Sequence, residues 1–147
     1  MNDDDIVEIL LVEDNPRDAE LTIRALKKHN LANRLFHVQD GAEALDFLLG
    51  RGKYEGRPTD ASPKVILLDL KLPKMNGLEV LRIIKSDPEL YTIPIVVVTS
   101  SAEDPDMAAA YELGANSYVI KPVQFEAFMD AMSKLGIYWL MANHPLK

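Results

Sequence analysis

The stretch Val65-Ile66-Leu67-Leu68-Asp69 places four consecutive apolar residues directly before a carboxylate. A short, continuous apolar run that stops at polar residues is typical of a strand buried on both faces, as in a parallel sheet. We therefore predict a strand over residues 64–68, with Asp69 just beyond its carboxyl end. Similar apolar runs at residues 6–12 and 95–99 predict two further strands of the same kind.

Segments with apolar residues at helical spacing separate these runs. The predicted helices span about residues 16–28, 41–49, 78–87, 107–113 and 125–135, and weaker or shorter strand signals lie at residues 34–39 and 117–120. Five strands that are each followed by a helix predict an α/β fold with a parallel sheet, right-handed crossovers and helices on both faces. The irregular stretch at residues 50–62 is expected to form an exposed loop.

Composition excludes several classes of protein. The 147 residues are enough for one compact domain with a core, and the absence of cysteine excludes disulfides, thiolate catalysis and Cys-ligated metals. The net charge of −7 argues against binding to a nucleic-acid backbone. No run approaches the ~18 apolar residues of a membrane span, and the acidic start at residues 1–5 is unlike a secretion signal. We expect a soluble, cytoplasmic, acidic domain that binds neither nucleic acid nor membrane.

Polar residues follow the predicted strands at the points where these strands end. They are Glu13 and Asp14 after the first strand, Asp69 after the third, Thr99 at the end of the fourth and Lys121 after the fifth. In doubly wound parallel sheets, ligands bind beyond the carboxyl ends of the strands. We therefore expect three carboxylates, a hydroxyl and an ammonium to converge at one edge of the sheet.

The predicted cluster has the chemistry of phosphoryl transfer. Three neighbouring carboxylates repel one another, and a Mg²⁺ ion relieves this repulsion because it prefers oxygen ligands. No His or Cys is positioned to select zinc. Lys121 suits phosphate oxygens, and the Thr99 hydroxyl can donate a hydrogen bond to the same group. Transfer of a phosphoryl group to a carboxylate, giving an aspartyl phosphate, uses all of these parts.

Five short motifs make the chain resemble the receiver domain of two-component response regulators. The motifs are Leu11-Val12-Glu13-Asp14-Asn15, Leu68-Asp69-Leu70-Lys71-Leu72-Pro73, Asn76-Gly77, Thr99-Ser100 and Tyr118-Val119-Ile120-Lys121-Pro122. The resemblance extends over about residues 6–135. It implies a flavodoxin-like (βα)5 fold with strand order 2-1-3-4-5, and a single receiver domain over residues 1–147.

The resemblance also implies a role for each acidic residue. Asp69 would be the phosphoacceptor, which receives a phosphoryl group from a sensor histidine kinase or a phosphotransfer protein. Glu13, Asp14 and Asp69 would hold Mg²⁺, together with the backbone carbonyl of Lys71. Such a protein is a switch and not an enzyme, because it catalyses only its own phosphorylation and dephosphorylation.

The remaining motif residues would bind the phosphoryl group and report its presence. By resemblance, Thr99 and Lys121 contact the phosphoryl oxygens, Thr99 and Tyr118 form the switch, and the Lys121-Pro122 peptide bond is cis. Considered alone, Lys121 fits a surface lysine and Tyr118 fits ordinary packing, so these assignments depend on the whole set.

The stretch at residues 50–63 and the aromatic tail Tyr138-Trp139-Leu140 resemble more narrowly the cyanobacterial phytochrome-type single-domain response regulators. This resemblance implies a phytochrome-type kinase as the partner. Residues 136–147 would form a C-terminal helical extension, and its apolar excess predicts a homodimer through the C-terminal face.

Two other classes of protein stay open from the sequence. A Mg²⁺-dependent phosphatase with an aspartyl nucleophile usually carries a second Asp two residues later, where this chain has Lys71. A flavodoxin-like cofactor binder needs a hydroxyl- or Gly-rich loop after the first strand, where Glu13-Asp14-Asn15-Pro16 would repel a phosphate. The three histidines, His29, His37 and His144, are interpreted as structural or surface residues.

Overall fold

The structure, a computed structural model, describes residues 7–28, 34–58, 62–100 and 104–135. In these residues five parallel strands form one sheet in the order β2-β1-β3-β4-β5. The strands are β1 (Ile9–Val12), β2 (Leu35–Val38), β3 (Val65–Leu68), β4 (Ile95–Thr99) and β5 (Ser117–Ile120). The helices are α1 (Pro16–Lys27), α2 (Gly41–Leu49), α3 (Gly77–Ser86), α4 (Asp104–Glu112) and α5 (Phe125–Lys134). The predicted fold class and strand order are confirmed.

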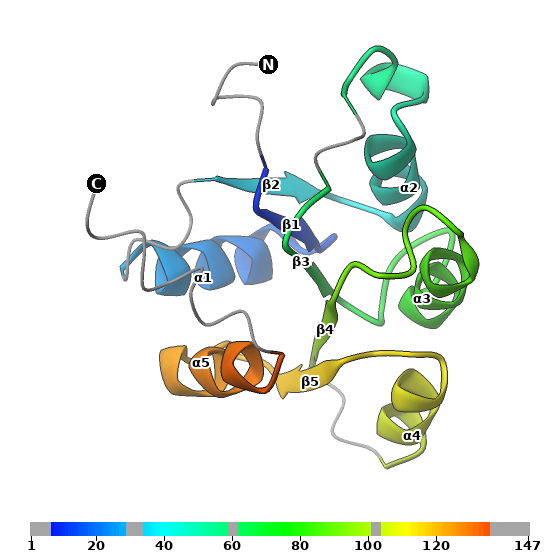
Figure 1. Ribbon diagram of the computed structural model, residues 1–147. Helices are drawn as coiled ribbons and strands as arrows, with labels where there is room; N and C mark the ends of the chain where they lie inside the picture. The colour runs from blue at the N-terminus through cyan, green and yellow to red at the C-terminus, as the bar shows by residue number, and fades with distance from the viewer. Residues whose placement is uncertain (1–6, 29–33, 59–61, 101–103, 136–147) are drawn as a thin grey trace.

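Alternation along the strands divides the core into two layers. Leu10 and Ile66 pack with α2 and α3 on one face of the sheet, whereas Ile9 and Leu67 pack with α1 and α5 on the other. Figure 1 shows α1 and α5 on one side of the sheet and α2, α3 and α4 on the other. The three central strands are buried on both faces, which explains their unbroken apolar sequences.

Side-chain caps fix where the helices begin. The Asn15 side chain accepts hydrogen bonds from the N–H groups of Arg17 and Asp18, and Pro16 occupies the first turn of α1. Asp40 and Asn76 cap α2 and α3 in the same way. Only three residues therefore separate the end of β1 from the first turn of α1, which remains next to the carboxyl edge of the sheet.

The structure differs from the sequence predictions in three places. β1 begins at Ile9, and α4 begins at Asp104. The expected start of that helix at residue 107 was late, because its polar first turn carries no apolar periodicity. The exposed loop predicted at residues 50–62 contains a 3-10 helix, η2 (Gly52–Tyr54). Tyr54 holds η2 against α2, because its hydroxyl donates to Glu43 at 2.6 Å and its ring packs edge-on against Phe47.

Residues 136–147, which were expected to form a helical extension, lie outside the described residues. Among the residues that the structure describes, no helix has the length and apolar character needed to cross a bilayer.

Candidate functional site

Two carboxylates occupy adjacent places at the carboxyl edge of the sheet. The hydrogen-bond ladder continues one residue beyond the strands, with Glu13 N–H donating to the Val38 carbonyl at 3.0 Å and Asp69 N–H donating to the Val12 carbonyl at 3.1 Å. This pairing holds the backbone of both acids in the register of the central strands. The side chains are buried, with Glu13 1% and Asp69 5% exposed.

Asp14 completes a group of three acids. One carboxylate oxygen from each of Glu13, Asp14 and Asp69 lies within 4.8 Å of the other two. Asp14 is exposed, whereas the other two acids are buried, so the group is open to solvent on one side. The structure therefore brings together the three carboxylates that were predicted to converge.

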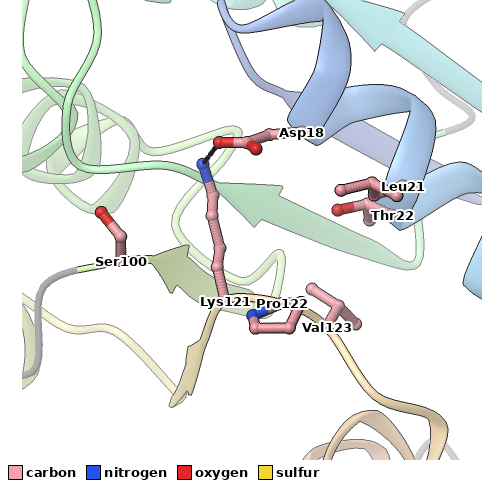
Figure 2. A pocket seen from close by; sticks show the side chains of 7 residues that line it. All are labelled: Asp18, Leu21, Thr22, Ser100, Lys121, Pro122 and Val123. Carbon is pink, nitrogen blue, oxygen red and sulfur yellow. Dashed lines mark hydrogen bonds and ion pairs between the residues drawn. The ribbon is translucent and has the colours of Figure 1, made fainter.

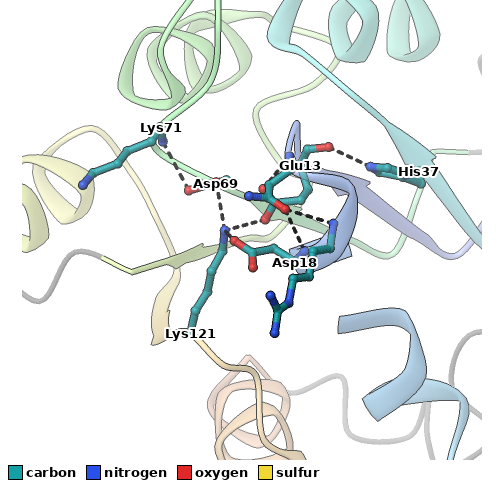
Figure 3. Close-up of polar contacts among 8 residues, drawn as sticks. Glu13, Asp18, His37, Asp69, Lys71 and Lys121 are labelled. Atoms are coloured by element: carbon teal, nitrogen blue, oxygen red, sulfur yellow. Dashed lines mark hydrogen bonds and ion pairs between the residues drawn. The ribbon is translucent and has the colours of Figure 1, made fainter. Parts of the chain in front are cut away.

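Lys121 joins this acidic group from the end of β5. Its Nζ lies 2.6 Å from Glu13 Oε1, 3.0 Å from Asp69 Oδ2 and 3.0 Å from Asp18 Oδ2, and its side chain is 12% exposed (Figure 3). The Lys121 N–H donates to the Thr99 carbonyl at 2.9 Å, which positions the lysine next to the end of β4. The predicted convergence of Lys121 with the carboxylates is present.

Burial and crowding determine the ionisation of this group. Burial raises the pKa of Glu13 to about 7, and the neighbouring Asp69 charge adds to the rise, against the opposing effect of Lys121. Burial alone would lower the pKa of Lys121, but its hydrogen bonds to Glu13, Asp18 and Asp69 outweigh burial and raise that pKa. One ammonium is shared by three carboxylates, so it cannot fully stabilise the charge on Glu13.

Two residues of the site were not predicted to be there. Asp18, in the first turn of α1, pairs with Lys121, and His37 Nε2 in β2 lies 2.7 Å from the Glu13 backbone oxygen. His37 thus has the structural role expected of it, but at the site. One signal in the sequence pointed to Asp18, since it lies in the first turn of the helix that Asn15-Pro16 begins, close to the end of the first strand.

Backbone hydrogen bonds fix the segment that follows β3, and one of them reaches the Asp69 carboxylate. The Lys71 N–H donates to Asp69 Oδ1 at 3.2 Å, and the Gly77 N–H donates to the Leu70 carbonyl at 2.8 Å. The Lys71 side chain is exposed. The role predicted for the Lys71 carbonyl as a metal ligand stays a prediction.

The predicted switch residues lie on neighbouring strands. Thr99 is fully buried at the end of β4 and is paired in register with Ile120 of β5. Tyr118 is half-buried, with its ring centroid 6.4 Å from that of the exposed Tyr111 in α4. The Lys121-Pro122 peptide bond is cis, as expected. The switching role of Thr99 and Tyr118 stays a prediction.

The donor set fits a hard divalent cation. The three grouped acids offer only oxygen atoms, which suits Mg²⁺ or Mn²⁺ and not a metal that prefers sulfur. The raised pKa of Glu13 supports the same fit, because a buried carboxylate that is short of positive charge gains most from a cation beside it.

The fold and this acidic edge define the class of protein. Residues 9–133 match the family of the response regulator receiver domain, and the chain belongs to this family. Among solved structures, it is 52% identical to the bacteriophytochrome response regulator AtBRR, with a TM-score of 0.83 over 91% of this chain and 95% of that chain.

Two further relatives have similar lengths. The chain is 42% identical to "Probable methanogenesis regulatory protein FilR2" of Methanothrix harundinacea, over 92% of this chain and 84% of that protein. It is 40% identical to the response regulator Rcp1 of Synechocystis, over 90% of this chain and 88% of Rcp1. The Mn²⁺-bound structure of Rcp1 superimposes with a TM-score of 0.73 over 91% of this chain and 94% of that chain. The narrower resemblance to phytochrome-type response regulators is thus confirmed.

Proposed function

We propose that this chain is a single receiver domain that switches partner binding when Asp69 accepts a phosphoryl group from a histidine kinase or a phosphotransfer protein. The observation that carries the proposal is the group of three acids around Asp69, together with the Lys121 ammonium 3.0 Å from the Asp69 carboxylate. In the transfer, the bond between phosphorus and the donor imidazole nitrogen breaks as a bond from an Asp69 oxygen to phosphorus forms. The leaving imidazole takes up a proton.

Glu13, Asp14, Asp69 and the Lys71 carbonyl would hold Mg²⁺. When bound, this ion offsets the negative charge of the acids and of the arriving phosphoryl group. The Lys71 N–H already holds Asp69 Oδ1, which orients the carboxylate while its other oxygen faces Lys121. Lys121 would then donate to a phosphoryl oxygen, since an ammonium is a compact charge suited to phosphate.

Thr99 and Tyr118 would carry the signal away from Asp69. Thr99 is buried at the end of β4, next to the strand that carries Tyr118 and is followed by Lys121. A hydrogen bond from the Thr99 hydroxyl to the phosphoryl group would draw it inward, and Tyr118 would occupy the vacated space. The surface formed by α4, β5 and α5 would change, and with it the affinity for a partner.

The phosphoryl donor is proposed to be a phytochrome-type kinase. The support is the likeness to AtBRR, which is a bacteriophytochrome response regulator. Two exposed apolar side chains, Ile120 at the end of β5 and Tyr111 in α4, support a homodimer through the C-terminal face. The cytoplasmic location expected from the sequence stays a prediction.

Catalytic turnover of external phosphoesters is not part of this proposal. The residue two positions after Asp69 is Lys71, whose side chain is exposed and whose backbone contacts the Asp69 carboxylate. A lysine ammonium at that position cannot act as the carboxylate acid-base group that aspartyl phosphatases place there. The switch therefore explains the site better than an enzyme does.

Intact-mass spectrometry after incubation with acetyl phosphate and Mg²⁺ tests the proposal. We expect the mass gain of one phosphoryl group, which EDTA prevents and Asp69→Asn abolishes. Asp130→Asn, in the exposed ion pair with Lys134 on α5, is the matched control and should still gain the group. A phosphorylated Asp69→Asn protein, or no gain by the wild type, would overturn the proposal.

A further inference from the structure

Three carboxylates share the Lys121 ammonium, and one of them lies outside the metal-binding group. An ammonium has three N–H donors, and Lys121 faces Glu13, Asp69 and Asp18 at 2.6, 3.0 and 3.0 Å. Two of these acceptors, Glu13 and Asp69, belong to the group of acids that would hold the cation. Asp18 comes from α1 and contacts the site through Lys121.

Binding of a divalent ion changes what Lys121 can contact. With a divalent ion bound, Glu13 and Asp69 would direct oxygen atoms to the ion and the ammonium would face a second positive charge, so these two acceptors would become weaker for Lys121. The Lys121 side chain is only 12% exposed, and a poorly hydrated ammonium without an acceptor is costly. It needs another carboxylate or a path to water.

We propose that Asp18 is a positioning residue, which keeps the Lys121 ammonium at the site when a divalent ion takes Glu13 and Asp69. The inference rests on the proposed function, because it assumes that the acidic group binds the ion. Held by Asp18, the ammonium stays within reach of a phosphoryl group on Asp69. Asp18 is not a member of the group of acids that would hold the ion, and its contact with the site is the ion pair with Lys121.

The local structure gives Asp18 a fixed place and gives Lys121 room to move. The Asp18 N–H donates to the capping side chain of Asn15 at 3.1 Å, so its backbone belongs to the well-defined start of α1. A pocket of about 210 Å³ separates α1 from the segment after β5, and both Asp18 and Lys121 line it. Figure 2 shows the ammonium reaching across this pocket to Asp18, with Leu21 and Pro122 on its walls.

Proton exchange of the lysine ammonium groups, measured by NMR on uniformly 15N-labelled protein, tests the inference. An ammonium that is held by a carboxylate and shielded from water exchanges slowly enough to give a signal. Lys121→Gln assigns the Lys121 signal by its disappearance. Lys85 provides an internal reference, because its ammonium donates to the Tyr91 and Ile93 carbonyls, away from the acidic group.

We expect the wild-type Lys121 signal to persist at saturating Mg²⁺. In Asp18→Asn, exchange of this ammonium should become faster by about tenfold in the Mg²⁺-bound protein, because an ionic acceptor has been replaced by a neutral one. Glu20→Gln removes one negative charge from the same helix, where Glu20 pairs with Arg24, and should leave the exchange unchanged. The Lys85 signal should stay constant in every variant, which shows that the fold is retained.

The outcomes separate this inference from the function on which it rests. In one outcome, Mg²⁺ shifts the backbone signals of Glu13 and Asp69 in both wild type and Asp18→Asn, but Lys121 exchanges equally fast in the two proteins. This outcome would overturn the role of Asp18 and leave the proposed metal site standing. If Mg²⁺ shifts no signal in the wild type, the proposed metal site and the inference both fail.

Discussion

Glu13 is the most buried acid of the site, and burial makes its negative charge unfavourable. Its side chain is 1% exposed, and it shares the Lys121 ammonium with two other carboxylates. The Asn15 N–H donates to its second oxygen at 3.2 Å, but this does not compensate for the loss of water. The pKa of Glu13 therefore rises to about 7, so this carboxyl group takes up a proton close to neutral pH.

The raised pKa of Glu13 predicts a pH-dependent affinity for Mg²⁺. The folded, metal-free protein holds this proton more tightly than the unfolded chain, whose Glu has a pKa of 4.5, so the contribution of Glu13 to stability falls as the pH rises from 4.5 to about 7. Mg²⁺ needs the ionised carboxylate and displaces the proton. Between about pH 6 and about pH 8, the Mg²⁺ affinity should rise about tenfold, as measured by isothermal titration calorimetry.

The same titrations detect the released proton through buffers of different ionisation enthalpy. Glu13→Gln should bind Mg²⁺ more weakly and lose most of the pH dependence, since an amide has no proton to give up in this range. An affinity that stays constant between about pH 6 and about pH 8 in the wild type would contradict the role of Glu13.

At the scale of elements, the start of α3 is built against the backbone of Asp69. The Gly77 N–H donates to the Leu70 carbonyl. A Cβ atom at Gly77 would overlap the backbone carbonyl oxygen of Asp69 and the Cα atom of Leu70. Glycine is needed here for close approach, and its φ is not positive. The first residue of α3 thus helps to hold the segment that carries the phosphoacceptor.

Gly77→Ala should therefore destabilise the protein and disturb the site together. We expect the free energy of unfolding to fall by about 1–3 kcal/mol, the usual cost of forcing a methyl group into a packed place. Urea unfolding measures this change, and intact-mass time courses with acetyl phosphate should show slower phosphorylation. Ser86→Ala, at the exposed other end of α3, should change neither quantity. Full stability in Gly77→Ala would show that the backbone relaxes without cost.

The strands and their ends could be predicted because one physical pattern determines both. A strand buried on two faces is apolar throughout, so the first carboxylate after Leu68 marks where the chain leaves the core. Parallel pairing then places that acid beside Glu13, although β1 and β3 are separated by a whole βα unit. The predicted bounds of β4 were correct for this reason, whereas those of β5, which is only partly buried, were correct from a shorter apolar signal.

Contacts that depend on how a helix is rotated about its own axis could not be predicted in this way. The hydrogen bond from Lys121 to Asp18 joins residues 103 positions apart, and it exists only because α1 presents this side chain to the end of β5. The η2 turn depends on the rings of Phe36, Phe47 and Tyr54, which come from three elements. No local pattern in residues 50–62 contains that information.

At the scale of the whole molecule, the last strand, β5, forms one edge of the sheet, and its residues range from buried to exposed. β5 pairs only with β4 in the sheet order. Beside this edge, Ile120 is 39% exposed and Tyr111 of α4 is 49% exposed. The sequence beyond α5 adds five apolar residues, Ile137-Tyr138-Trp139-Leu140-Met141. Exposed apolar side chains such as Ile120 and Tyr111 are typical of an interface between chains, and the apolar sequence after α5 is of the same character.

Removal of the residues after Leu135 should convert a homodimer into a monomer, as measured by sedimentation velocity. The apolar segment at residues 137–141 would supply part of the buried interface, so its loss should weaken association, whereas phosphorylation of Asp69 should continue because its site lies at the strand ends. Ile120→Ser tests the contribution of the β5 edge, and Tyr91→Ser is its control, because Tyr91 is 54% exposed in the turn before β4. A truncated chain that still sediments as a dimer would place the interface elsewhere on the molecule.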